Sequence, residues 1–517
     1  MKKFNTAGTC FPDIHYMADI TDKVQKTAKM VEEGSYFCIN RGRQYGKTTL
    51  LYGLKQYLQS EYMVFSITFE GLSDEDFENA DAFYRTFFSC MKGVARNPKN
   101  NITKPVLEIL GNAIKQEKLD ARISKDIIYD ICYGADKPIV IIIDEVDQAG
   151  NYEMFVKFLG MLRAMYLQRQ DSKAFHSVIL AGVYDIKNLK LKLRSESEHQ
   201  YNSPWNIAVN YDVDMSLSSK GIAGMLTEYM DDHHVEIDVN FMADLLREYT
   251  AGYPFLVSRL CQIIDEKNIT WDKEGFLQAV NILLNEHNTI VDDIAKKLEA
   301  FPMLKEMLKE ILYSGKKQSY NIIVKEIDLA YRFGYIYNND GYVAVTNRIF
   351  ETLLYNFFIA EDSLREVLHT EGSIDKKSFI KNGSLDMRHV LERFVVHYNE
   401  IYSSKDAKFL ENTGRKLFLL YLRPIINGVG HYYIEAQTRD ETRTDIIVDY
   451  LGKRYIIELK IWHGRAYNEA GRQQLAEYLE LMGEDEGYLL SFSFNKNKTV
   501  GVKEENCLGK KIVEVLV

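Results

Sequence analysis

The sequence predicts a multidomain α/β protein with a parallel β-sheet near its N-terminus, and three observations support this prediction. The 517 residues are too many for one hydrophobic core, so we expect two to four domains. Residues 138–145 (PIVIIIDE) form an apolar run that ends in two carboxylates, as in a strand buried on both faces of a parallel sheet. Residues 46–49 (GKTT) lie between an apolar stretch and a helix-like stretch, which is the position of a phosphate-binding loop.

The residues around GKTT predict how this loop would hold phosphates. Lys47 would reach the β- and γ-phosphates of a nucleotide, and the hydroxyl of Thr48 would hold Mg²⁺. The loop departs from the usual P-loop pattern, because Arg41 stands where the first glycine is expected and Gly42 follows it. Without a ligand, this segment would simply be the basic start of a helix. Backbone N–H groups would wrap the phosphates from Arg43, Gln44, Tyr45, Gly46, Lys47, Thr48 and Thr49.

The two carboxylates that end the apolar run complete the predicted site. Asp144 would bind Mg²⁺ through water, and Glu145 would orient or deprotonate the water that attacks the terminal phosphate. Adjacent carboxylates at the end of a buried strand indicate a nearby cation, because an unpaired desolvated charge is costly. The alternative for Glu145 is an ordinary solvated loop residue. Together, the loop and the carboxylates predict a P-loop NTPase domain that binds ATP and Mg²⁺.

Residues 1–210 are predicted to form this NTPase core. A long, mostly helical stretch is expected at about 72–135, and the strands are expected at 36–40, 63–69, 138–144 and 177–181. Residues 211–290 have a helical pattern that is interrupted by Gly252-Tyr253-Pro254, and they are predicted to form a helical lid.

The next part of the chain combines helices with a hairpin signal. In residues 291–360, helices lead to two alternating apolar segments, and residues 338–341 (NNDG) between them are a strong turn signal. This order predicts a winged-helix-like domain, with a plain helical connector that carries one hairpin as the alternative. Residues 361–400 are predicted to be a helical linker.

Residues 401–517 change pattern again and predict a second α/β domain. An amphipathic helix over 407–422 is expected to stop at Arg423-Pro424, because proline interrupts helices. After it we expect strands at 432–437, 444–449 and 455–459, a helix at 469–482 and a strand at 487–492.

Two of these strands would carry the residues of a second candidate catalytic site. A tight turn between adjacent antiparallel strands brings Asp445 and Glu458 to the same end, and Lys460 shares a strand face with Glu458. Two carboxylates can bind a divalent cation and position a water beside a phosphate, and the lysine would stabilise or help deprotonate the nucleophile. The alternative is a surface ladder of salt bridges without catalytic function.

This hairpin looks like the core of the PD-(D/E)XK nuclease superfamily, with Thr444 where proline is common. The resemblance implies a restriction-endonuclease-like domain whose metal ligands are Asp445 and Glu458, with Mg²⁺ or Mn²⁺ as the metal. In RecB-like members a Gln-xxx-Tyr element contacts DNA near the metal, and Gln474 and Tyr478 match this element. Glu411 is a weaker match to a helix-borne glutamate of the superfamily.

Over nearly its full length, the chain resembles a bacterial family of AAA-ATPase-like proteins with a C-terminal PD-(D/E)XK nuclease domain. The ATPase part also resembles the STAND group of signalling ATPases and their origin-recognition relatives. There a Gly-x-Pro turn in the lid touches the nucleotide, which implies this role for Gly252 and Pro254. Arg194 would be an arginine finger or sensor, or alternatively a solvated arginine. The resemblance rests on residues 40–48, 143–145, 201–206, 252–254, 445 and 458–460.

Composition limits the class of protein. The formal net charge is −10, which argues against a wholly basic polyanion-binding face but leaves room for a local nucleic-acid groove. No stretch approaches 18 continuous apolar residues, and the N-terminal residues lack the apolar region of a signal peptide. The six cysteines have neither metal-site nor disulfide spacing. We therefore expect a cytoplasmic protein without membrane association.

The leading hypothesis is an ATPase that regulates a Mg²⁺-dependent nuclease acting on DNA, with defence against phage or mobile DNA as a fitting role. One alternative is an ATP-dependent switch whose nuclease-like domain binds nucleic acid without cutting it. Another is a scaffold for protein partners, and a homo-oligomer or an unidentified protein partner fits any of these hypotheses.

Overall fold

The computed structural model forms two compact units. Unit 1 comprises Met1–Arg247, Ala251–Phe276 and Arg332–Gly334, and unit 2 comprises Glu248–Thr250, Leu277–Tyr331 and Tyr335–Val517. The predicted division into five segments is finer and stays a prediction. The structure describes residues 1–150, 152–183, 205–314, 318–363, 367–381, 384–401, 411–426, 430–434, 446–451, 453–462, 464–494 and 500–517.

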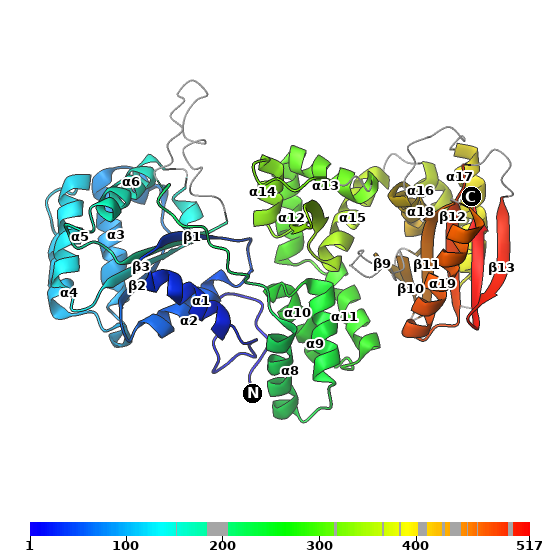
Figure 1. The fold of residues 1–517 in the computed structure, drawn as a ribbon, viewed down its shortest axis with the longest axis horizontal. Coiled ribbons are helices and arrows are strands. Elements are labelled where there is room, and N and C mark those ends of the chain that lie inside the picture. The colour runs from blue at the N-terminus through cyan, green and yellow to red at the C-terminus, as the bar shows by residue number, and fades with distance from the viewer. Residues whose placement is uncertain are drawn as a thin grey trace, which may run out of the picture. The chain divides into compact units, whose positions relative to one another are not determined.

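Unit 1 contains the predicted parallel sheet (Figure 1). Its four strands follow the spatial order β1-β4-β3-β2, so β4 lies between the strand before the phosphate-binding loop and the strand that ends at Asp144. The backbone N–H of Val209 donates to the Tyr36 carbonyl at 2.8 Å and extends the sheet beyond β1. All four strands lie where the sequence predicts them: β1 (Tyr36–Asn40), β2 (Met63–Thr68), β3 (Ile139–Asp144) and β4 (Ser177–Gly182).

Helices cover both faces of this sheet (Figure 1). Alternate residues along a strand point to opposite faces, so Phe37 and Ile142 pack on the side of α1 (Thr21–Glu32) and α2 (Lys47–Leu58). The helices on the other face fall in the long stretch that was predicted to be helical, and α6 follows β3: α3 (Ala80–Val94), α4 (Lys104–Ile114), α5 (Ala121–Gly134) and α6 (Glu153–Leu167).

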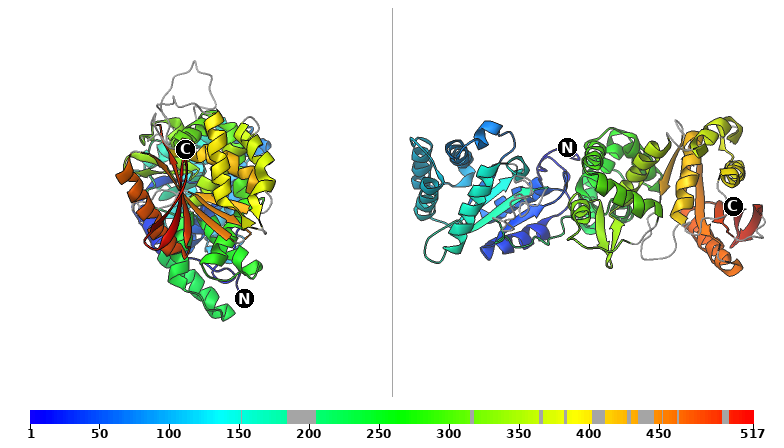
Figure 2. Two further views of the ribbon diagram at one scale, coloured as in Figure 1. Left: turned by 90° about the vertical axis from the view of Figure 1, so that its right-hand side faces the viewer. Right: turned by 90° about the horizontal axis from the view of Figure 1, so that it is seen from above.

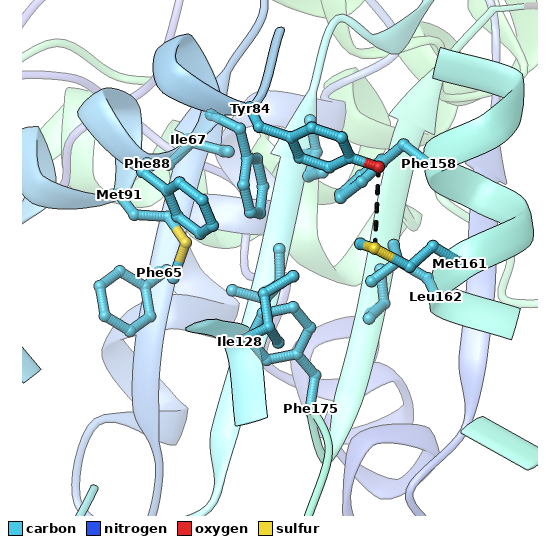
Figure 3. Close-up of a cluster of buried hydrophobic side chains, with 14 of the residues drawn as sticks. Phe65, Ile67, Tyr84, Phe88, Met91, Ile128, Phe158, Met161, Leu162 and Phe175 are labelled. Carbon is cyan, nitrogen blue, oxygen red and sulfur yellow. Dashed lines mark hydrogen bonds between the residues drawn. The ribbon is translucent and has the colours of Figure 1, made fainter. Parts of the chain in front are cut away.

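The core on this second face is rich in aromatic side chains (Figure 3). Tyr84 is fully buried in it, and its hydroxyl donates to the sulfur of Met161 at 3.7 Å, which joins α3 to α6. Phe158 packs edge-on against Phe83 at a ring separation of 5.3 Å. These contacts fix the sheet and therefore the strand ends that carry the site.

The helical pattern after the sheet is confirmed. It contains α8 (Ser219–His233), α9 (Val239–Thr250), α10 (Pro254–Glu266) and α11 (Lys273–Asn285). In unit 2 the chain continues as α12 (Thr289–Ala300), α13 (Pro302–Ser314) and α14 (Lys325–Arg332).

The hairpin predicted from NNDG is also present. Strand β5 (Ile336–Asn339) pairs with β6 (Tyr342–Val345), and Asp340 and Gly341 adopt the positive φ values, 49° and 89°, that the tight turn requires. Helix α15 (Arg348–Ser363) follows, and the assignment as a winged helix stays a prediction.

The C-terminal part of unit 2 forms a mixed six-stranded sheet with the order β13-β14-β12-β11-β10-β9. The last two strands were not predicted from the sequence. The predicted helix stop at Arg423-Pro424 is wrong, because α18 continues through Pro424 and buries Ile425 and Ile426. The elements are α16 (Val367–Asp375), β7 (Ile380–Lys381), β8 (Ser384–Leu385), α17 (Met387–Ile401), α18 (Glu411–Ile426), β9 (Gly430–Ile434), β10 (Ile446–Tyr450), β11 (Lys453–Ile461), α19 (Arg465–Met482), β12 (Glu486–Phe492), β13 (Gly501–Cys507) and β14 (Lys510–Leu516).

Helices cover both faces of the C-terminal sheet (Figure 2, left). Phe492 on β12 meets Phe394 of α17 on one face, at a ring separation of 6.4 Å. A Cβ atom on Gly471 of α19 would lie 3.6 Å from the Lys460 side chain, so α19 covers the opposite face, which carries Lys460.

The helices before this sheet are joined through one half-buried carboxylate. Asp375 at the end of α16 lies 2.8 Å from the ring of His397 on α17 and accepts a hydrogen bond from the Tyr421 hydroxyl on α18 at 2.9 Å. Burial alone would raise the pKa of Asp375, but hydrogen bonds from His397, Arg393 and Tyr421 outweigh it and lower that pKa. The segment predicted as a linker thus contributes packed helices to unit 2.

Candidate functional site

The loop between β1 and α2 is a tight turn that ends in the N-terminus of a helix. Gly46 is the N-cap of α2 with φ 81°, and Gln44 also has a positive φ of 57°. A positive φ is strained for a residue that carries a Cβ atom. A Cβ atom added at Gly46 would lie 3.5 Å from the Pro254 ring. The turn therefore presents the N-terminal N–H groups of α2, where an anion is favoured.

Lys47 is nearly buried inside this loop, with 6% of its surface exposed. Its ammonium group donates to the carbonyl oxygens of Arg41 at 2.9 Å and Gly42 at 3.0 Å. The loop carbonyls thus hold a positive charge at the centre of the turn. That position suits an ammonium group that neutralises phosphate oxygens.

Thr48 and Asp144 meet although they are 96 positions apart in the sequence. The Thr48 hydroxyl donates to Oδ2 of Asp144 at 3.0 Å, and Oδ1 of Asp144 accepts the Glu145 backbone N–H at 2.9 Å. Hydroxyl and carboxylate oxygens are ligands that Mg²⁺ accepts, and Mg²⁺ takes only a few protein ligands when phosphates supply others. This pair therefore fits a Mg²⁺ ion bound together with a nucleotide.

Glu145 follows Asp144 in an unusual backbone conformation. Its φ is 53°, which is uncommon for a residue with a side chain and is often found at functional sites. Burial raises the pKa of the Glu145 carboxyl, and the positive charge of Lys47 opposes that rise only in part.

Lys47, Thr48 and Glu145 line one cavity of about 400 Å³. Besides the loop, its walls include Glu145, Pro254 and Phe255, and a segment near the N-terminus that the sequence analysis did not identify. The Cys10 backbone N–H donates to the Thr49 hydroxyl at 3.1 Å, which holds this segment over α2. The lining residues from this segment are Asn5, Thr6, Gly8, Cys10, Tyr16, Met17, Ala18 and Ile20.

The Gly252-Tyr253-Pro254 turn brings α10 to the loop. Pro254 opens α10, and Tyr253 packs edge-on against Tyr45 at a ring separation of 4.8 Å. Gly252 has a φ of 70°, and its carbonyl accepts the Leu217 N–H at 2.7 Å. Pro254 lines the cavity, whereas Gly252 shapes the turn behind it.

Replacing Gly252 with alanine should distort this turn. A Cβ there would lie 2.1 Å from both the Leu217 carbonyl oxygen and the Arg247 guanidinium, so the backbone must move. We expect a loss of about 2–3 kcal/mol in the free energy of unfolding of unit 1 and weaker ATP binding. Thermal unfolding and calorimetric titration with ATP would measure both effects.

Gly224→Ala is the matched control, because Gly224 lies in α8 with open space around it and should tolerate a methyl group. Equal behaviour of the two variants would show that the turn does not need glycine.

In the C-terminal sheet, Glu458 and Lys460 lie side by side on β11. The ammonium group of Lys460 is 2.8 Å from Oε1 of Glu458, and the Glu458 side chain is only 1% exposed. Asp445 lies outside the described residues. Its neighbour Ile446 pairs with Ile457, which directly precedes Glu458.

The other sequence-predicted residues of this domain are less closely gathered. Gln474 and Tyr478 lie on α19, where Tyr478 is buried and Gln474 is partly exposed. Glu411 is the first residue of α18. Arg194, like Asp445, lies outside the described residues.

The family to which the chain belongs follows from its match to a family model. The model of the AAA-like domain matches residues 14–356, which is more than half of the chain. The chain belongs to this AAA-like family. Its P-loop NTPase-like parallel sheet with flanking helices agrees with that assignment.

Solved structures similar to this AAA-like chain include archaeal proteins. A Walker-type ATPase of Pyrococcus abyssi has 11% identity and a TM-score of 0.48, covering 68% of this chain and 99% of its own. The ORC2 protein of Aeropyrum pernix in ADPNP–ADP complexes has 11% identity and a TM-score of 0.36, with coverages of 66% and 93%. The ORC1 protein of the same organism, in complex with DNA, has 12% identity and a TM-score of 0.30, with coverages of 67% and 94%. No protein with a curated description matches the chain.

The described ranges contain neither a cluster of three metal-ligating side chains nor a candidate membrane span. Within these ranges, no three His, Cys, Asp or Glu side chains gather as a metal site. No helix there combines the length and the apolar character needed to cross a membrane.

Proposed function

We propose that this AAA-like protein binds and hydrolyses ATP with Mg²⁺ at the site between β1 and β3. The contact between the Thr48 hydroxyl and the Asp144 carboxylate beside Lys47 carries this proposal. Lys47 and Thr48 line one cavity, and the Thr48 hydroxyl contacts the Asp144 carboxylate, so an ammonium, a hydroxyl and a carboxylate that can interact with a Mg²⁺-bound triphosphate lie close together.

Each residue would have a separate task in hydrolysis. Lys47 and the N–H groups of α2 would bind the β- and γ-phosphates, and Thr48 and Asp144 would hold Mg²⁺, which would neutralise developing phosphate charge. Glu145 accepts a proton from the attacking water, and burial favours this because it raises the pKa of the carboxyl. Pro254 contacts the nucleotide from the lid and so reports its presence to α10.

We further propose that the C-terminal domain is a PD-(D/E)XK nuclease. Two observations support this proposal: the elements follow the order α18, β9, β10, β11, α19, β12, and Glu458 and Lys460 form an ion pair on β11. Glu458 and Asp445 would hold Mg²⁺ or Mn²⁺, and Lys460 would stabilise the attacking hydroxide. Gln474 and Tyr478 would contact DNA.

ATP state would then control DNA cleavage within one polypeptide. The second candidate is an ATP-dependent switch that binds DNA without cutting it. The tight ion pair between Lys460 and Glu458 supports this candidate, because a carboxylate already neutralised by lysine binds a metal less readily.

Cleavage assays on the full-length chain test the proposal. Single- and double-stranded DNA would be incubated with Mg²⁺ or Mn²⁺, with and without ATP. We expect cleavage that requires the metal and changes with ATP. ATP-dependent DNA binding without cleavage would select the switch, and the absence of both DNA binding and cleavage would contradict a role on DNA.

A further inference from the structure

The wall of the nucleotide cavity at the strand ends carries three polar side chains. They are Glu70, Glu145 and Gln148, and only Glu145 was predicted from the sequence. Glu70 and Gln148 are exposed and line the cavity, so both are accessible to a ligand or water in it.

Strand pairing places Glu70 beside the catalytic carboxylates. Thr68 at the end of β2 lies opposite Asp144 at the end of β3, and the Phe69 N–H donates to the Asp144 carbonyl at 3.1 Å. The Glu70 N–H then donates to the Thr68 hydroxyl at 3.0 Å, which turns the chain at the edge of the sheet. Glu70 and Glu145 therefore leave adjacent strands at the same edge.

Gln148 approaches the cavity from the turn after Glu145. It ends the short 3₁₀ helix Val146–Gln148, and its N–H donates to the Glu145 carbonyl at 3.2 Å. The side-chain amide of Gln148 can both donate and accept hydrogen bonds, whereas the Glu70 carboxylate can only accept them.

A second carboxylate in a cavity for a triphosphate needs an explanation, because it repels the phosphates and weakens their binding. A carboxylate that accepts a hydrogen bond from a water can offset this cost by orienting the water for attack. The amide of Gln148 can accept the second hydrogen of that water, or donate to the γ-phosphate.

We propose that Glu70 and Gln148 hold the attacking water together with Glu145. This inference rests on the proposed ATPase function and extends its catalytic machinery. The water oxygen bonds to the γ-phosphorus, and the bond between that phosphorus and the oxygen bridging to the β-phosphate breaks. ADP leaves with the bridging oxygen, and the proton lost by the water passes to Glu145.

The test compares Glu70→Gln and Gln148→Leu with wild-type full-length protein, using Mg²⁺-ATP turnover and the affinities for ATP and ADP. Glu70→Gln should slow turnover about tenfold or more, because positioning and proton-accepting groups contribute factors of this size. It should also tighten ATP binding about threefold, with little change for ADP, because the removed charge faces the γ-phosphate. Gln148→Leu should slow turnover without tightening ATP binding.

Glu75→Gln is the matched control, since Glu75 is exposed and lies outside the cavity lining. Turnover of Glu70→Gln within twofold of this control, with an unchanged preference between ATP and ADP, would overturn the inference. A different result, wild-type protein that neither binds nor hydrolyses ATP, would contradict the proposed ATPase function itself.

Discussion

Lys47→Ala is expected to weaken ATP binding by about a hundredfold or more, which corresponds to roughly 3 kcal/mol. The variant removes the positive charge at the centre of the loop and leaves the carbonyls of Arg41 and Gly42 without their shared donor. Calorimetric titration of the full chain with Mg²⁺-ATP would measure the loss. Mg²⁺-ADP should show a smaller loss, because the lysine interacts with the γ-phosphate as well as the β-phosphate.

Lys55→Ala provides the control for this prediction. Lys55 lies on the same helix two turns further on, outside the cavity lining, and its removal should leave ATP affinity unchanged. ATP affinity of Lys47→Ala equal to that of Lys55→Ala would contradict the assignment of the nucleotide site.

Lys460→Ala is expected to abolish DNA cleavage and to destabilise the C-terminal domain. Glu458 is almost fully buried and would lose the cation that lies 2.8 Å from its carboxylate. Breaking a buried ion pair from one side costs about 3–5 kcal/mol, so a melting experiment should show the change directly. A loss of cleavage in Lys460→Ala could therefore result either from the missing catalytic group or from unfolding of the domain.

Lys460→Arg separates the two effects. Arginine keeps the positive charge beside Glu458, so most of the stability should return. Its guanidinium stays protonated and differs in shape from an ammonium group, so cleavage should stay lost. Lys453→Ala, at the exposed start of the same strand, should be close to wild type in both measurements. Cleavage that persists in Lys460→Ala would place the nuclease site elsewhere.

The elements that could be predicted from the sequence are those whose local residue pattern agrees with their burial. The four parallel strands are short apolar runs because both of their faces are covered, and such runs are visible without any knowledge of their partners. The loop and the carboxylates were recognisable because phosphate binding requires particular residue types at fixed spacing, and the structure brings Thr48 and Asp144 together.

Most of the features that were missed depend on tertiary contacts, whereas β14 was missed although its apolar residues are visible in the sequence. β13 carries Lys503, Glu504 and Glu505 and is largely exposed as an edge strand, so it has no apolar run. Pro424 was expected to end α18, but burial of the residues around it outweighs the lost hydrogen bond. No sequence motif marks the N-terminal wall of the cavity or Glu70, because only the folded chain brings these residues to the site.

That N-terminal wall also constrains when the nucleotide site can first exist during synthesis. Ser258 on α10 donates to the Asn5 carbonyl at 2.7 Å, so two parts of the cavity wall are 253 positions apart in the chain. The ribosome makes residue 5 long before residue 258, and contacts of such long range form late. A nascent chain that ends before α10 would have the sheet and the phosphate-binding loop but an incomplete cavity, so tight ATP binding should begin only after α10 has left the ribosome.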